Sequence, residues 1–126
     1  MPRVSPEDLP SGPLVQGFSS GGFSVSGVVY RGLFLTPEQA TEWAPPASAA
    51  ELTFDHVEPL LGLSPPPEFL LLGTGARIAF PPRAFIRAVE ARGLGVEVMD
   101  SRAAARTWGL LRGEERWIVA AMMPFV

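Results

Sequence analysis

The second half of the chain alternates strand patterns with helix patterns, and this alternation constrains the fold more than any other feature. A continuous apolar run at residues 68–72 ends at Gly73, and further strand patterns follow at residues 95–99 and 116–123. Helix patterns separate these strands at residues 82–91 and 101–111. Strand, helix, strand, helix, strand is the order of an α/β sheet, so we expect that fold class. The expected core residues are Leu70, Leu72, Val96, Val98, Ile118 and Val119, together with a hairpin from the first half.

The first half of the chain carries weaker patterns. Residues 1–16 alternate prolines with small and polar residues, which predicts a flexible N-terminal arm. β-branched and aromatic residues at 23–35 predict a β-hairpin with its turn at Ser26-Gly27 and a second arm covered on both faces. The sequence from Thr36 to Gln39 resembles a capping box and predicts a short helical turn. A short helix is expected at residues 55–61, although Pro59 interrupts it.

Length and composition exclude several classes of protein. A chain of 126 residues forms one domain, which we place at residues 17–126. The net charge of −3 gives no strong field for nucleic acid, and the absence of cysteine excludes disulfides and thiolate zinc sites. The N-terminus has no apolar signal-like run, and the longest apolar run is about half of what a membrane-spanning helix needs. We therefore expect a cytoplasmic protein that is not embedded in a membrane.

Two motifs suggest catalysis, and each has a simpler explanation. Residues 17–21 match the G-x-S-x-G pattern of a nucleophile elbow, but a Pro-rich segment precedes them where a buried strand is needed. His56 is the single histidine, and a surface or helix-capping role explains it better than a general base without an orienting partner. The sequence therefore predicts no catalytic residues, no metal site and no cofactor.

The loop Gly73-Thr74-Gly75 follows the apolar strand, where α/β sheets place their ligands. A dinucleotide site is disfavoured because Ile78 occupies the third glycine position and the next helix begins near Pro82. A tight turn is the simpler interpretation, while a smaller anion could still bind the loop beside Arg77.

The segment after the strand at 95–99 forms the second part of this candidate site. Asp100 and Ser101 suit a helix N-terminus, with Ser101 as the expected N-cap. If the two strands are parallel neighbours, the glycine loop and Asp100-Ser101 emerge at the same edge of the sheet. The side chain of Arg106 would then tilt back toward Asp100 or the loop carbonyls. The candidate ligand- or partner-binding residues are therefore Gly73, Thr74, Gly75, Arg77, Asp100, Ser101 and Arg106.

Several of these segments resemble a known family. The runs LLLGTG, GVEVMDS, AAARTW and EERWIVAAMM, with a Pro-led helix between the first two, are similar to the small α/β domains that include mitochondrial complex I assembly factor 3 and the adipogenesis-associated domain proteins. The resemblance covers about residues 17–124. It departs at Ser101, where the family usually has threonine, and at Gly109, where it usually has asparagine, so any role of that amide is absent here.

The resemblance implies a three-layer α/β domain with a mixed central sheet and no established catalytic activity. It also implies a protein partner, as in the assembly of a respiratory or other membrane complex. Two hypotheses therefore stay open at this point. One is a non-enzymatic protein-interaction module, and the other is a small-molecule or anion-binding domain or enzyme that uses the loop after residues 68–72.

Overall fold

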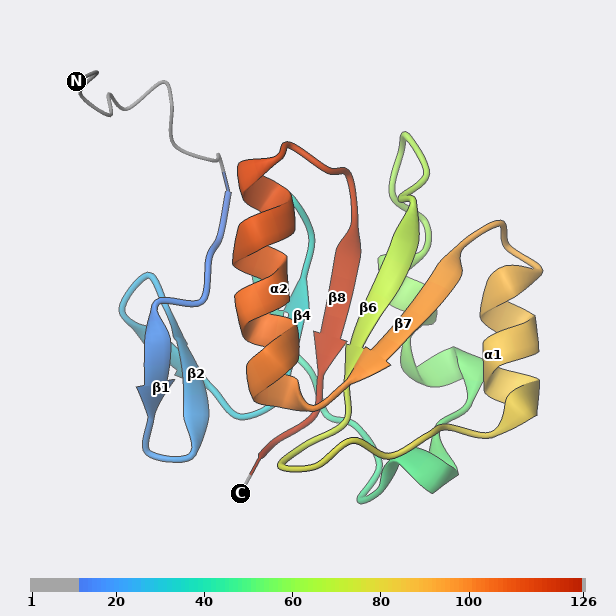
Figure 1. Cartoon of the computed structure of the whole chain (residues 1–126), viewed down its shortest axis with the longest axis horizontal. Helices are drawn as coiled ribbons and strands as arrows, with labels where there is room; N and C mark the ends of the chain where they lie inside the picture. Colours follow the sequence, from blue (N-terminus) through green and yellow to red (C-terminus); the bar gives the residue numbers. More distant parts are fainter. Residues whose placement is uncertain (1–11, 126) are drawn as a thin grey trace.

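A mixed five-stranded sheet forms the centre of the computed structural model, which describes residues 12–125 (Figure 1). Strand β6 (Phe69–Gly73) is parallel to both of its neighbours, β7 (Gly95–Met99) and β8 (Val119–Met122). On the other side of β8, the strands β4 (Leu33–Leu35) and β5 (Ala40–Glu42) continue the sheet in antiparallel pairing. The strand order is β5-β4-β8-β6-β7, so the expected mixed α/β sheet is confirmed.

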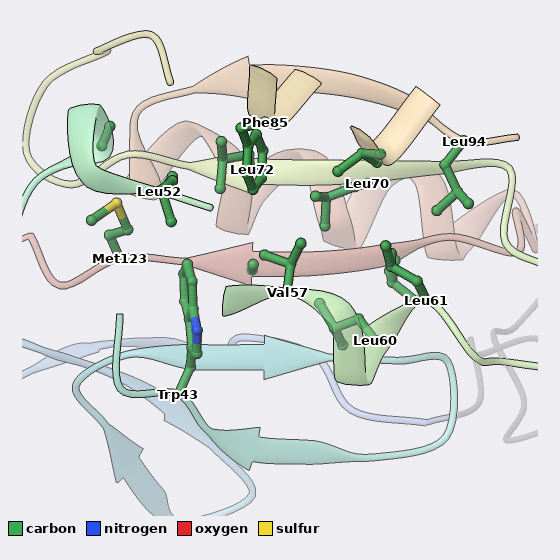
Figure 2. Packing of buried hydrophobic residues seen from close by; sticks show 14 residues of the cluster. Trp43, Leu52, Val57, Leu60, Leu61, Leu70, Leu72, Phe85, Leu94 and Met123 are labelled. Carbon is green, nitrogen blue, oxygen red and sulfur yellow. The ribbon is translucent and has the colours of Figure 1, made fainter. Parts of the chain in front are cut away.

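Two helices cover opposite faces of this sheet, because successive side chains of a strand point to opposite sides. Leu70 and Leu72 of β6 pack in one cluster with the helix α1 (Arg83–Glu90), as Figure 2 shows. Leu71 packs on the other side with the helix α2 (Ser101–Gly113). The expected core residues are buried except Val96 and Val98, which are half-buried because β7 is the last strand of the sheet.

The segment between β5 and β6 covers the α1 face with three short 3-10 turns. These are η2 (Ala49–Glu51), η3 (Phe54–His56) and η4 (Glu58–Leu60). The short helix expected at residues 55–61 is therefore wrong in kind, because two 3-10 turns stand in its place. Pro59 has no N–H to donate, and the next amide, of Leu60, bonds to the carbonyl of Val57 at 2.9 Å, three residues back. The apolar side chains of this segment still face the sheet (Figure 2).

A small antiparallel sheet lies beside α2 and is built from β1 (Gly17–Ser19), β2 (Gly22–Val25) and β3 (Val28–Tyr30) (Figure 1). The hairpin turn at Ser26-Gly27 is confirmed, with φ of 49° and 82°. The prediction that residues 28–35 form one second arm of this hairpin is wrong. They divide into β3 and β4 (Leu33–Leu35), which belong to different sheets. Val28 and Val29 are 50% and 45% exposed, so only the β4 part of the arm is buried as expected.

The expected helical turn after Thr36 is a turn between two strands. Strands β4 and β5 pair with Leu35 opposite Ala40, which leaves only four residues to connect them. The hydroxyl of Thr36 accepts hydrogen bonds from the amides of Glu38 and Gln39 at 3.2 and 3.0 Å. The capping interaction predicted by the motif is present, but the pairing of the strands leaves no room for a helix.

The predicted N-terminal arm lies largely outside the described residues, because residues 1–11 are not among them. Within the described part, the carbonyl of Pro13 accepts a hydrogen bond from the indole N–H of Trp108 at 2.9 Å. Leu14 and Val15 pack against the α2 cluster. Residues 13–15 are therefore attached to the domain.

Candidate functional site

The loop after β6 meets the first turn of α2 at the carboxyl edge of the parallel strands. The amide of Gly75 donates a hydrogen bond to Ser101 Oγ at 2.8 Å, and the amide of Ser101 donates to the carbonyl of Gly75 at 2.8 Å. Ser101 is fully buried, and its hydroxyl donates to the carbonyl of Met123 at 2.7 Å. The geometric expectation for Gly73-Thr74-Gly75 and Asp100-Ser101 is confirmed, because β6 and β7 are parallel neighbours.

Gly73 allows α2 to lie directly against the end of β6. A Cβ atom at this position would lie 2.9 Å from the Cα of Ser101 and 3.1 Å from the Cβ of Ala104. The first of these atoms is backbone, so the helix itself would have to move. Glycine is required here for close packing of a helix on a strand, and this accounts for one glycine of the loop without a ligand.

Thr74 organises the rest of the loop. Its Oγ1 lies 2.9 Å from the carbonyl oxygen of Arg77 and 3.2 Å from that of Met99, and it accepts a hydrogen bond from the amide of Ala79 at 2.9 Å. The amide of Thr74 donates to the carbonyl of Met99 at 2.9 Å. The polar groups of the loop are therefore used largely to fix its own conformation.

Asp100, rather than Ser101, is the N-cap of α2. Its carboxylate accepts a hydrogen bond from the amide of Ala103 at 2.9 Å, while Ser101 is the first helical residue. The expectation of Ser101 as the cap is wrong by one residue. The reason is that the Ser101 hydroxyl points into the sheet edge, where it bonds to backbone groups of two other segments.

The side chains of the two arginines of the candidate site lie apart from this network, although the backbone carbonyl of Arg77 belongs to it. Arg77 is exposed on the loop. Arg106 is also exposed and lines a small hollow with residues 15–18, and its side chain makes no hydrogen bond to Asp100 or to the loop. The expected contact of Arg106 is therefore wrong. Ser101 faces the sheet, and a residue five positions later lies about 140° further around the helix, so Arg106 points away from the loop.

A pocket of about 300 Å³ lies beside the loop, at the same edge of the sheet. Its polar side chains come from Thr74, Arg31 and Ser48, and prolines, Ala47 and Met123 line the remainder. Sequence reasoning missed Arg31 and Ser48 because they reach this edge through the antiparallel pairing of β4 and β5, which no local motif indicates. The pocket could hold a small anion, since it contains a guanidinium and hydroxyl groups.

His56 and the pair Glu68–Arg116 have structural roles. The amide of Thr53 donates to Nδ1 of His56 at 2.9 Å, so this histidine caps the turn η3, which agrees with its simpler explanation. At the opposite edge of the sheet, the guanidinium of Arg116 pairs with Glu68 at 2.8 Å, and this hydrogen bond lowers the pKa of Glu68 below its ordinary value. Among residues 12–125, no three His, Cys, Asp or Glu side chains are grouped so that they could hold a metal ion.

Comparison with known proteins gives the family. Residues 15–123 match the family described as "Protein of unknown function (DUF498/DUF598)". The chain belongs to this family. A relative from Rhodobacter capsulatus is 33% identical over 111 residues, which cover 87% of this chain and 83% of that uncharacterised protein.

Several vertebrate relatives of this DUF498 chain carry a functional name. NADH dehydrogenase (ubiquinone) 1 alpha subcomplex assembly factor 3 of Danio rerio is 27% identical over 122 residues, covering 96% of this chain and 70% of that protein. The human protein of the same name is 30% identical over 111 residues, which are 87% of this chain and 60% of the human protein. The resemblance found in the sequence is thus confirmed.

Solved structures give the same fold. The crystal structure of a Bordetella parapertussis protein superposes with a TM-score of 0.80 at 34% identity, covering 90% of this chain and 97% of that one. The NMR structure of a Bordetella pertussis protein described as a Mth938-like domain gives 0.78 at 26% identity, over 98% of this chain and 90% of that one. The DUF498 chain therefore has a Mth938-like fold.

Gly109 of the DUF498 chain is not required by packing. A Cβ at this position would meet nothing within 4 Å, although the family resemblance leads us to expect asparagine here. No helix within residues 12–125 has the length and apolar character needed to cross a lipid bilayer, and α2, the longer of the two α-helices, has 13 residues.

Proposed function

We propose that this chain is a non-enzymatic protein-interaction module that acts as an assembly factor for a respiratory or other membrane complex. The observation that carries the proposal is its similarity, over 96% of its length, to a relative named as an assembly factor of NADH dehydrogenase. Similarity over nearly the whole chain means that the compared unit is the complete α/β domain. The proposal includes a protein partner and the cytoplasmic location expected from the sequence.

The geometry of the sheet edge supports binding over catalysis. General acid–base or nucleophilic chemistry needs a nucleophile, a base and an orienting group within hydrogen-bond distance of one another. Ser101 is buried and bonded to two backbone groups, and His56 is used as a cap in another part of the chain. The side chains of the candidate site therefore do not supply such a set.

The alternative, an anion or small-molecule site on the glycine loop, has less support. An anion at such a loop is bound by backbone amides that point outward. Here the amides of Thr74 and Gly75 donate to Met99 and Ser101 within the protein. What remains for a ligand is the neighbouring pocket with Arg31 and Ser48.

The proposal is tested by deleting the gene in the organism that encodes it and separating its membrane complexes on native gels. We expect less fully assembled NADH dehydrogenase, more incomplete subcomplexes and lower NADH oxidation by isolated membranes. The wild-type chain supplied in trans should restore all three, while the amount of ATP synthase serves as an internal control. Normal assembly and activity in the deletion strain would refute a role in the assembly of this enzyme.

A second measurement separates the two hypotheses. A tagged chain purified from its own organism should carry enzyme subunits in a fixed ratio, whereas a bound metabolite found by native mass spectrometry would favour the small-molecule alternative.

A further inference from the structure

The loop between β6 and α1 exposes two large apolar side chains. Ile78 is 52% exposed and Phe80 is 72% exposed, which is the largest exposure of any large apolar residue within residues 12–125. Single exposed apolar residues are common on protein surfaces, but two of them at the tip of one loop form a patch that favours contact with another apolar phase.

The loop is held in this exposed conformation from three sides. At its start, Gly75 is bonded through both its amide and its carbonyl to Ser101. In its middle, the hydroxyl of Thr74 accepts the hydrogen bond of the Ala79 amide, next to Phe80. At its end, Pro81 is buried and Pro82 is the N-cap of α1. Because the backbone is fixed on both sides of Phe80, this side chain stays outside the core, and binding requires little further ordering of the loop backbone.

Arginines flank these two side chains along the chain. Arg77 precedes Ile78, and Arg83 begins α1, with Arg87 one helical turn later, and all three are exposed. No acidic residue occurs between positions 69 and 89. Figure 1 shows this loop running along the carboxyl edge of the sheet to the first turn of α1. An apolar tip with cationic flanks is complementary to a surface that is apolar inside and anionic outside.

We propose that this loop binds the domain to an anionic lipid bilayer, with Ile78 and Phe80 entering the boundary between headgroups and acyl chains. Arg77 and Arg83 lie beside them and contact the lipid phosphates. This binding goes beyond the proposed function and does not depend on it. The occupant is lipid rather than protein for two reasons. Ile78 and Phe80 are more than half exposed, so they can enter an apolar phase without a shaped pocket. The polar groups that order the loop are bonded within it, whereas protein interfaces also depend on hydrogen bonds.

Co-sedimentation with lipid vesicles tests the proposal on the full chain. One set of vesicles contains phosphatidylcholine alone, and the other contains phosphatidylcholine and phosphatidylglycerol in equal amounts. We expect binding to the second set only, weakened by added salt because the charges are exposed. Phe80→Ala should lower the partition coefficient about tenfold, which corresponds to about 1.4 kcal/mol. The double variant Arg77→Gln, Arg83→Gln should lower it at least as much.

Matched controls come from α2, on another face of the molecule. Leu110 is 71% exposed, nearly as much as Phe80, so Leu110→Ala removes an equally accessible apolar side chain and should leave vesicle binding unchanged. Arg106→Gln is the corresponding control for charge, and the thermal unfolding midpoint verifies that every variant folds.

Three outcomes would overturn the proposal. The first is no binding of the wild-type chain to anionic vesicles, and the second is equal binding to both kinds of vesicle. The third is an equal loss for Leu110→Ala and Phe80→Ala. Loss of a protein partner by Phe80→Ala in the absence of vesicle binding would assign the loop to a protein interface and would also refute lipid binding.

Discussion

Replacement of Ser101 by alanine tests whether its hydroxyl stabilises the fold by linking α2 to the loop after β6 and to the segment after β8. The hydroxyl of Ser101 is fully buried, donates to the carbonyl of Met123 at 2.7 Å and accepts from the amide of Gly75 at 2.8 Å. Ser101→Ala leaves both backbone groups without this partner, and each buried unsatisfied group costs about 1–3 kcal/mol. The two groups together cost about 2–6 kcal/mol, and alanine favours the helix by up to about 0.5 kcal/mol, so we expect a net loss of about 1.5–5.5 kcal/mol.

Urea unfolding followed by tryptophan fluorescence measures this loss, since Trp43 and Trp108 are buried. At about 4 °C per kcal/mol for a domain of this size, the midpoint of thermal unfolding should fall by about 6–22 °C. Ser48→Ala is the matched control, because Ser48 is exposed and its side chain makes no capping hydrogen bond. If Ser101→Ala lowered the free energy of unfolding by less than about 1 kcal/mol, as little as the control does, this linking role of Ser101 would be refuted.

Three further predictions concern other parts of the molecule. Arg106→Ala should change the free energy of unfolding by less than about 0.5 kcal/mol, because its side chain is exposed; a larger loss in urea unfolding would contradict this placement. Removal of residues 1–14 should destabilise the chain by about 1–3 kcal/mol more than removal of residues 1–11, because only the longer truncation deletes the acceptor of the Trp108 indole N–H; equal stabilities would show that this bond contributes nothing. The hydrogen bond from Arg116 lowers the folded-state pKa of Glu68 below its ordinary 4.5, so its contribution to stability is present above that pH and is lost as the pH falls through the folded-state pKa. The free energies of unfolding of wild type and Glu68→Gln, measured by urea titration, should therefore differ at neutral pH and converge in acid. A difference that does not change with pH would contradict a stabilising Glu68–Arg116 ion pair.

The second half of the chain was predictable because its signals are local. The apolar run before Gly73 indicates a strand with both faces covered, and the structure covers them with one helix each. The helices themselves are marked by Pro82 at the start of one and Asp100 at the start of the other. Each of these signals depends on residues within one turn or one strand of each other, so composition and spacing suffice to read them.

The first half was predicted less well because its local signals agree with more than one pairing. The apolar residues at 28–35 look like one strand, yet Val28 and Val29 stay exposed in the small sheet while Leu33 and Leu35 enter the central one. Similarly, the cap at Thr36 is real but stabilises a hairpin turn. Which partner a short strand takes is decided by the surface available on β8 and α2, and that surface exists only in the folded chain.

The sequence by itself determined the α/β class and the order of strands and helices in the second half. On the condition that β6 and β7 are parallel neighbours, it also indicated that the glycine loop meets the start of α2. Only the tertiary structure decided which side chains contact one another at this edge of the sheet. Burial turned the Ser101 hydroxyl inward as a link between three segments, and the rotation of α2 carried Arg106 away from the loop. The antiparallel strands brought Arg31 to the same edge, and the Thr74 hydrogen bonds left Phe80 facing solvent. The physical reason is that local patterns fix the backbone of an element, whereas the direction and partners of a side chain depend on how distant elements pack against it.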